Sequence, residues 1–306
     1  MPKKVEFDEL VEEAIRQGGL ANLRPVVEKE LLHYDILFCL SEAGLLKGLT
    51  FQGGTSLRLC YGSNRFSEDL DFAGGRDFCS ADLIKVKNCI EDYLGERYGL
   101  EVTVKEPRDL REQPEYAEVK VDKWQISVIT APENKDIPRQ RIKIEIANIP
   151  AYTHAYRQLV RNYTVLPDGY SDTLIKVETL EEVMADKLVS LPAATHRIRY
   201  RDMWDLIWLQ QQGATIDVNL VSRKLSDYKI ERFQEKIQNR LDSFREIIED
   251  GKFYAEMKRF IPSSVYETSI GKEGFSLFLQ DSLKDLFTQL KKGLYSDGSG
   301  VNSFRL

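Results

Sequence analysis

The chain has 306 residues, 42% of them hydrophobic, which is enough to bury a full core and to form two lobes. A net charge of −6 and a pI near 5.4 argue against a broad nonspecific nucleic-acid surface, although they leave room for a local one. No apolar run approaches the length that crosses a bilayer, and the first residues are too acidic and polar for a secretory signal, so we expect a cytoplasmic protein without membrane contact.

Apolar periodicity predicts two helices at the N-terminus. The first covers residues 6–18, and the second runs from near Pro25 to about Gly44. Side chains spaced 4, 3 and 4 residues apart give the second helix one apolar stripe, which consists of Val27, Leu31, Tyr34 and Phe38.

A strand-to-helix turn follows at the glycine pair. Residues 49–52 resemble a short strand, and Gly53-Gly54 supplies the open backbone of a sharp turn. We expect Thr55 or Ser56 to cap the next helix. Exposed amide groups and the positive end of the helix dipole would make this turn an anion site for the triphosphate of an NTP.

Two carboxylates come next, in Asp69-Leu70-Asp71-Phe72. The alternation predicts a strand with its apolar pair on one face and both carboxylates on the other. Adjacent carboxylates hold a hard cation such as Mg²⁺ or Mn²⁺, which can bridge phosphate oxygens and activate an attacking hydroxyl. Taken alone, a Gly-Gly pair is usually a simple turn, and Asp-x-Asp is more often a solvated strand end.

The rest of the chain predicts a sheet followed by helices. A helix at 81–96 leads into strands at 100–105, 117–130 and 140–147, and the pattern becomes helical after about residue 172. The predicted fold is therefore α+β, with a mixed sheet at residues 1–172 and a C-terminal helical bundle at 173–306. The segment at 296–300 is predicted to be a loose end.

A third carboxylate is predicted on a neighbouring strand. In residues 141–146 the isoleucines fall on one face and Lys143 and Glu145 on the other, so Glu145 can point where Asp69 and Asp71 point. The alternative is an ordinary solvated Lys/Glu face.

Four further polar residues are candidates for the site. Ser67 precedes Asp69 by two residues and can face the same cleft, and Arg65 is close enough to hold phosphate oxygens bidentately, although both could simply stabilise a turn. Lys187, on a predicted helix, can carry charge to a triphosphate, whereas most helix lysines lie on the surface. Asp202 has the position of a helix N-cap before MWDLIWL.

Basic and metal-binding residue types give weaker signals. Residues 139–143 and 196–201 are basic clusters that could neutralise a few phosphates or could pair with nearby acids. Three scattered histidines and four cysteines without a Cys-x-x-Cys spacing exclude a zinc or histidine metal centre, and we expect reduced thiols in or near the core.

The order of strand, Gly-Gly, Thr/Ser, helix and Asp-x-Asp strand resembles the DNA polymerase β-like nucleotidyltransferase superfamily. The string GGTSLR…YG…RFSEDLDF resembles the AbiEii/MenT family, nucleotidyltransferase toxins of type IV toxin–antitoxin systems, from about Leu31 to about Trp208. VMADKLVSL resembles the family's Asp-Lys helix, whose lysine is functional. Residues 199–206 match its Arg-x-Lys/Arg-Asp-x-x-Asp-Leu segment, which makes Asp202 a polar member of the cleft and Asp205 a supporting partner.

This resemblance implies a metal-dependent enzyme that moves a nucleoside monophosphate from an NTP to a hydroxyl and releases pyrophosphate. It also implies a tRNA 3′ end as acceptor, blocked translation, a cognate antitoxin and a role in phage defence. Two alternatives remain. One is a nucleotidyltransferase of the same fold that modifies a small molecule or a protein. The other is an inactive binding protein, against which the intact carboxylates and Lys187 count.

Overall fold

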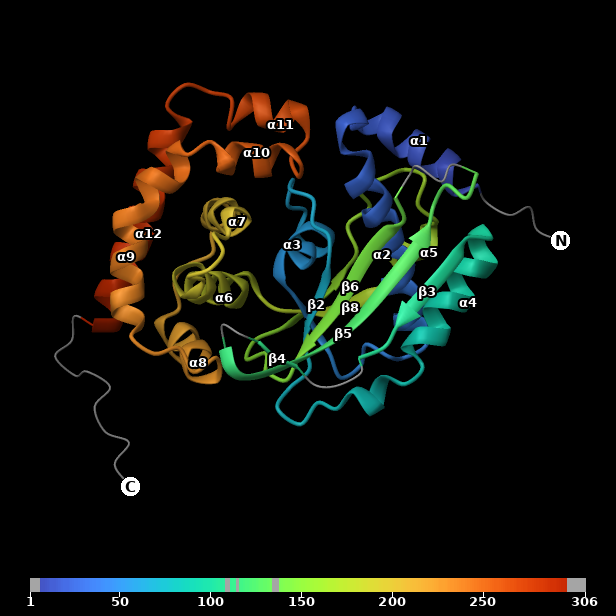
Figure 1. Cartoon of the computed structure of the whole chain (residues 1–306), viewed down its shortest axis with the longest axis horizontal. Coiled ribbons are helices and arrows are strands. Elements are labelled where there is room, and N and C mark those ends of the chain that lie inside the picture. Colours follow the sequence, from blue (N-terminus) through green and yellow to red (C-terminus); the bar gives the residue numbers. More distant parts are fainter. Residues whose placement is uncertain (1–5, 108–110, 114–115, 134–137, 296–306) are drawn as a thin grey trace. The chain divides into compact units, whose positions relative to one another are not determined.

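The computed structural model describes residues 6–107, 111–113, 116–133 and 138–295, which form two compact units (Figure 1). The first unit contains the chain up to Gln113, Val119–Thr179 and Lys258–Tyr266. The second contains residues 116–118, Leu180–Met257 and the segment from Glu267 onward. The domain boundary after residue 172 stays a prediction, and residues 173–179 pack in the first unit. The predicted loose end at 296–300 lies outside the described residues.

The first unit is a mixed sheet with helices. Its helices are α1 (Phe7–Gly18), α2 (Arg24–Glu42), α3 (Gly53–Tyr61), α4 (Val86–Tyr98) and α5 (Asp168–Ser171), with short 3₁₀ turns at Ala21–Leu23 and Ser80–Leu83. Its strands are β1 (Thr50–Gln52), β2 (Leu70–Ala73), β3 (Glu101–Lys105), β4 (Arg111–Gln113), β5 (Tyr116–Ile129), β6 (Gln140–Ala147), β7 (Ala155–Gln158) and β8 (Leu174–Val177).

The strands join into one sheet in the order β3-β5-β6-β2-β1-β8-β7, with β4 beside β5. The pairs β2/β6 and β1/β8 are parallel, and β1/β2, β3/β5, β5/β6 and β7/β8 are antiparallel. The mixed sheet and its N-terminal helices confirm the predicted α+β class. Because β2 lies between β1 and β6, the Asp-x-Asp segment is at the middle of the sheet.

The two faces of this sheet differ in chemistry. Buried side chains of one face, such as Phe72, Trp124 and Ile144, lie toward α2 and α4, which run along that side in Figure 1. Alternate residues point to the other face, where Lys143, Glu145 and their neighbours are half-buried or exposed. The period-2 pattern in the sequence therefore places the charged residues together on the face away from the two helices.

Two strands at one end of the sheet were not predicted. Residues 174–177 were expected to begin the helical region, but they form β8, which pairs in parallel with β1 and carries β7 on its other side. A segment of four residues is too short to show a helix or strand period, so its state is decided by the distant β1 edge that it completes.

The second unit is helical, as predicted. Its helices are α6 (Leu180–Ala193), α7 (Tyr200–Gln211), α8 (Val218–Asp227), α9 (Phe233–Glu249), α10 (Lys252–Lys258) and α12 (Phe275–Tyr295), and α11 (Ser263–Thr268) crosses the unit boundary. Helices α9 and α12 pack together, with the rings of Phe244 and Phe287 5.6 Å apart. Within the described residues, none of the helices has the length and apolar character to cross a membrane.

The cysteines are free thiols. Cys39 and Cys60 are buried and Cys89 is half-buried, in agreement with the expectation. Cys79 is exposed, so the prediction was wrong for this one residue, which lies in the segment before the 3₁₀ turn.

Candidate active site

A polar row crosses the open face of the sheet. Asp71 of β2 is paired in register with Glu145 of β6 on one side and with Gln52 of β1 on the other. Neighbouring strands lie about 4.8 Å apart, so these three side chains are direct neighbours. Asp69 precedes β2, and Lys123 of β5 is paired with Glu145 and extends the row.

Two lysines hold the outer carboxylates of this row. The Lys143 amide donates to Asp69 Oδ1 at 3.2 Å and its ammonium lies 3.6 Å from Asp69 Oδ2, while Lys123 Nζ lies 3.0 Å from Glu145 Oε1. Across the described part of the chain, no three His, Cys, Asp or Glu side chains converge as ligands of one ion. The predicted cluster of Asp69, Asp71 and Glu145 is therefore aligned on one face but not gathered around one point.

The residues of the row nevertheless suit a hard divalent cation. Their donor atoms are carboxylate and amide oxygens, the ligands that Mg²⁺ and Mn²⁺ prefer. A cation held there would replace the ammonium groups of Lys123 and Lys143 as the counter-charge. The amide oxygen of Gln52 is buried and has no hydrogen-bond partner among the described residues, so it too is available as an acceptor.

Gly53 joins this row to the helix α3. Its φ is +78°, and a Cβ placed on it would lie 2.9 Å from Asp71 Oδ2. The backbone can therefore approach the carboxylate only because the residue is glycine. Helix α3 begins at Gly53 with Gln52 as N-cap, and the Gln52 side chain does not cap the first amides of the helix. Uncapped amides at a helix start are suited to bind an anion.

We expect Gly53→Ala to destabilise the protein and to lower its activity. The positive φ alone costs about 1–2 kcal/mol for an alanine, and the contact with Asp71 adds displacement of the carboxylate. Gly62→Ala is the matched control, because Gly62 ends the same helix at φ +77° with open space around it. Urea unfolding should show a loss of stability in both variants, whereas nucleotide-transfer assays should show a loss of activity only in Gly53→Ala.

The hydroxyls of Thr55 and Ser56 are used inside the turn, so the prediction that one of them caps the helix was wrong. Thr55 Oγ1 donates to the carbonyl of Asp69, and Ser56 Oγ donates to the carbonyl of Gly53 at 2.8 Å. Both side chains are buried. The N-cap is Gln52, three residues before Thr55, and the Thr55 hydroxyl links the helix to the residue that precedes β2.

Arg65 and Ser67 lie against the next glycine. A Cβ on Gly54 would be 2.4 Å from Arg65 Nη2 and 3.1 Å from Ser67 Oγ. Arg65 is only 3% exposed, and its Nη1 donates to the carbonyl of Phe66 at 2.7 Å. The guanidinium is therefore buried between the Phe66 carbonyl and Gly54. The half-buried Ser67 hydroxyl lies beside the first residues of α3.

The loop that carries Asp69 is fixed from several sides. His33 Nε2 lies 3.0 Å from the carbonyl of Glu68, and Lys29 Nζ lies 2.7 Å from the Glu68 carboxylate. The Phe66 amide donates to the carbonyl of Phe260 at 2.8 Å, within the same unit. These contacts define the entry of the chain into β2, and they come from residues distant in sequence.

His33 makes this anchoring sensitive to acid. Burial lowers the pKa of His33 from its ordinary value near 6.5 to about 4. The unfolded chain therefore binds a proton between about pH 6.5 and pH 4 that the folded protein excludes, so stability falls as the pH is lowered through this window. We expect His33→Gln to remove this slope, which amounts to roughly 3 kcal/mol in the wild type. Urea unfolding of both proteins at pH 7, 5.5 and 4.5 measures this pH dependence. An equal loss of stability on acidification in the wild type and in His33→Gln would contradict the prediction.

The other predicted site residues lie in the second unit. Lys187 of α6 is 6% exposed, and its ammonium lies 2.8 Å from Asp202 Oδ1 and 2.7 Å from Asp205 Oδ2. Ser190 also donates to Asp202, at 3.2 Å, and Arg199 pairs with the same carboxylate. The sequence match to an Asp-Lys helix and a following Asp-x-x-Asp segment thus corresponds to one buried ion network.

The sequence predicted that Asp202 is the N-cap of α7, and this prediction was wrong. The helix begins at Tyr200 after Arg199, which places Asp202 in its first turn. Burial acts to raise the pKa of Asp202, but the charges and hydrogen bonds of Arg199 and Lys187 outweigh it and hold the pKa below the ordinary range. Since the folded pKa is depressed, this ion pairing contributes stability at all pH values above about 4 and is lost only in stronger acid.

Sequence reasoning missed several polar and charged groups around these sites. Lys123 and Gln52 could have been found from the strand alternation in KVDKWQISV and TFQ, which puts them on the carboxylate face. A second buried pair in α6 and α8, between Lys224 and Glu182 at 2.7 Å, gave no signal, because the two residues are far apart in the sequence.

Comparison with known proteins agrees with this geometry. Residues 35–284 match the family described as nucleotidyl transferase AbiEii toxin, type IV TA system. The chain belongs to the AbiEii family. It is therefore a nucleotidyltransferase of a toxin family whose systems pair the toxin with an antitoxin and which uses NTP substrates. Members of this family typically use a divalent metal. The sequence matches no curated protein.

Solved structures support the fold of this AbiEii-family chain. JHP933 from Helicobacter pylori is 17% identical, with a TM-score of 0.51 over 90% of this chain and 96% of that protein. Another H. pylori protein, assigned as a nucleotidyltransferase, is 16% identical, with a TM-score of 0.50 over 89% of this chain and 96% of its own. These likenesses are consistent with the predicted polymerase β-like core.

Proposed function

We propose that this AbiEii-family enzyme transfers a nucleoside monophosphate from an NTP to the 3′ hydroxyl of tRNA, with Mg²⁺ or Mn²⁺ as cofactor, and so blocks translation. The single observation that carries the proposal is the register of Asp71 beside Glu145, directly against the start of α3 at Gly53. Carboxylates and helix-terminal amides at one place suit the two charges of such a substrate complex, the cation and the triphosphate.

Each residue has a proposed role. Asp69, Asp71 and Glu145 would hold the metal, which neutralises phosphate oxygens and lowers the pKa of the attacking hydroxyl when bound. The amides of Gly53 and Gly54, fixed by Thr55, Ser56 and Arg65, would receive the triphosphate together with the Ser67 hydroxyl. Lys187 and Asp202 are proposed to supply charge and orientation.

The proposed reaction conserves every group. The acceptor oxygen forms a bond to the α-phosphorus, the bond from that phosphorus to the bridging oxygen of the β-phosphate breaks, and pyrophosphate leaves. The hydroxyl proton passes to a carboxylate of the site. The enzyme's part is mainly to position the reactants and to stabilise charge.

A labelling experiment tests the acceptor. Purified protein is incubated with each radiolabelled NTP, magnesium and total RNA, and the products are separated on a gel. We expect label on RNA of tRNA size. Label on the protein or on a small molecule would assign a different acceptor, and no label with any NTP would indicate an inactive protein.

Expression in bacteria tests the biological role. Induced wild-type protein is expected to arrest growth and to leave extra 3′ nucleotides on the tRNA pool, whereas Asp71→Ala at equal protein level should permit growth. Co-expression of the cognate antitoxin should also permit growth. Equal arrest by wild type and Asp71→Ala would show that toxicity arises from something other than nucleotide transfer.

A further inference from the structure

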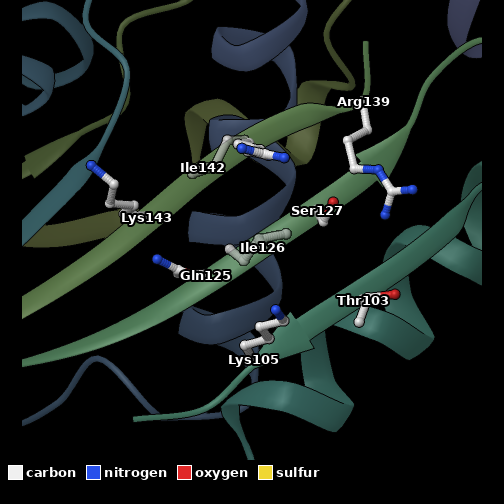
Figure 2. A pocket seen from close by; sticks show the side chains of 9 residues that line it. Thr103, Lys105, Gln125, Ile126, Ser127, Arg139, Ile142 and Lys143 are labelled. Atoms are coloured by element: carbon white, nitrogen blue, oxygen red, sulfur yellow. The ribbon is translucent and has the colours of Figure 1, made fainter.

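A basic cavity lies on the same sheet face as the carboxylate row. It has a volume of about 380 Å³ and opens over β3, β5 and β6. Figure 2 shows the side chains that line it, with Lys143 from β6, Gln125 and Ser127 from β5, and Thr103 and Lys105 from β3 on one side of the sheet. Arg139 and Arg141 complete the polar lining.

Strand register makes this cavity continuous with the carboxylates. Lys143 is paired with Gln125, which is paired with Lys105, so these three side chains form a second polar row beside the row of Glu145. Lys143 also contacts Asp69 of the carboxylate row, through both its backbone amide and its side-chain ammonium. The lysine is thus shared between the cavity and the site of the proposed chemistry.

Apart from Lys143, which lies beside Asp69, the cations of this cavity are not neutralised by the described part of the protein. In the described portion of the chain, Lys105, Arg139 and Arg141 form no ion pair and are exposed. The second basic cluster of the sequence behaves differently, because Arg199 pairs with Asp202 and Arg201 lies 3.5 Å from Glu256. In a chain of net charge −6, unpaired cations that share a cavity point to an anionic ligand.

The position of the cavity distinguishes the ligand from the NTP. Gly53 and α3 lie on the β1 side of Asp71, whereas the cavity lies on the β6 side of it. From Arg141 to Glu145 is four residues along β6, or about 13 Å. An RNA strand whose 3′-terminal sugar reached Glu145 would therefore lie along β6, and the phosphates that precede this sugar would lie over the cavity.

We propose that this basic cavity binds the phosphate backbone of the acceptor RNA, a few nucleotides before its 3′ end, through Lys105, Arg139 and Arg141. The proposal rests on the proposed function and adds the place where the acceptor strand is held. The contacts are to phosphates, so the cavity fixes the position of the strand and reads no sequence. Each contact releases counterions, which makes binding dependent on salt.

The test compares two doubly neutralised forms of the full chain. Lys105→Gln/Arg141→Gln removes two cavity cations. Lys85→Gln/Lys272→Gln removes the same charge at exposed lysines that lie outside the cavity and form no ion pair within the described residues. Binding of a fluorescein-labelled single-stranded RNA with a free 3′ hydroxyl is followed by anisotropy over a salt series, and KM values for RNA and NTP are measured by labelling.

We expect the cavity variant to bind the RNA at least about tenfold more weakly at 0.1 M salt and to lose roughly 1.4 from the slope of log affinity against log salt, since each single-strand phosphate contact contributes about 0.7. Its KM for RNA should rise while its KM for NTP and its kcat at saturating RNA stay unchanged. The control variant should match the wild type.

Other results separate the two proposals. If the wild type labels RNA but the cavity variant binds and labels it like the control, the cavity proposal is overturned and the proposed function stands. If the wild type binds RNA through the cavity but labels none of it, the proposed function is overturned and the cavity stands.

Two results would assign the cavity to another ligand. A raised KM for NTP would assign the cavity to the triphosphate, and unchanged RNA binding with lost antitoxin binding would assign it to an acidic protein surface. Both overturn the RNA proposal.

Discussion

Asp71→Asn is expected to abolish nucleotide transfer while the protein stays folded. The substitution keeps the shape of the side chain but removes the charge at the centre of the polar row, between Gln52 and Glu145. Loss of one charge-stabilising group in an active site commonly costs 10²–10³-fold in rate, and we expect a loss of about this size or larger. Labelling assays on protein whose fold is verified by circular dichroism measure it.

Asp122→Asn is the matched control. Asp122 lies in the same sheet, one position from Lys123, but its side chain belongs to the opposite, buried face, where it is 1% exposed. Burial raises the pKa of this carboxyl, and the neutral amide has almost the same shape. This variant should keep full activity. Activity in Asp71→Asn equal to that of Asp122→Asn would exclude the proposed metal assignment.

Local sequence signals were sufficient for the elements that hold the site. The alternation around β2 and the isoleucine pattern of β6 repeat with the period of a strand, because these strands bury one face. Helix α2 is buried on nearly all sides, so its predicted apolar stripe is only part of its buried surface. The carboxylate face followed from that alternation, and the parallel register then brought Glu145 beside Asp71.

The parts that were not predicted depend on contacts distant in sequence. Strand β8 exists because the edge of β1 is open to it, and nothing in LIKV alone encodes a strand. The start of α3 at Gly53 depends on Asp71, whose carboxylate leaves no space for a Cβ. Thr55, a plausible cap by its position, is instead drawn to the carbonyl of Asp69.

Burial of charge was the other property hidden from the sequence. Arg65 and Lys187 were read as groups that reach toward phosphate, but the structure encloses both. A charged side chain is buried only where partners compensate it, and those of Lys187 lie one helix further along the chain. The spacing of Asp202 and Asp205, three apart on one face of α7, is the one local sign that a cation packs against them.

The enclosed position of Lys187 leads to the second large effect. We expect Lys187→Met to lower the free energy of unfolding by about 3–5 kcal/mol, because it leaves two buried carboxylates without their shared cation. Loss of activity in this variant would therefore not by itself establish contact with the triphosphate. Stability and catalysis have to be separated by a second substitution.

Asp205→Asn is the second substitution that separates stability from catalysis. In Lys187→Met/Asp205→Asn the charge of Asp205 is removed together with that of Lys187, and Asp202 keeps its pairing with Arg199, so most of the lost stability should return. If Lys187 carries charge to the NTP, the double variant stays folded but slow, while Asp205→Asn alone remains active. Urea unfolding and labelling kinetics on the three variants measure both properties. Recovery of activity together with stability in the double variant would show that Lys187 only supports the helical unit.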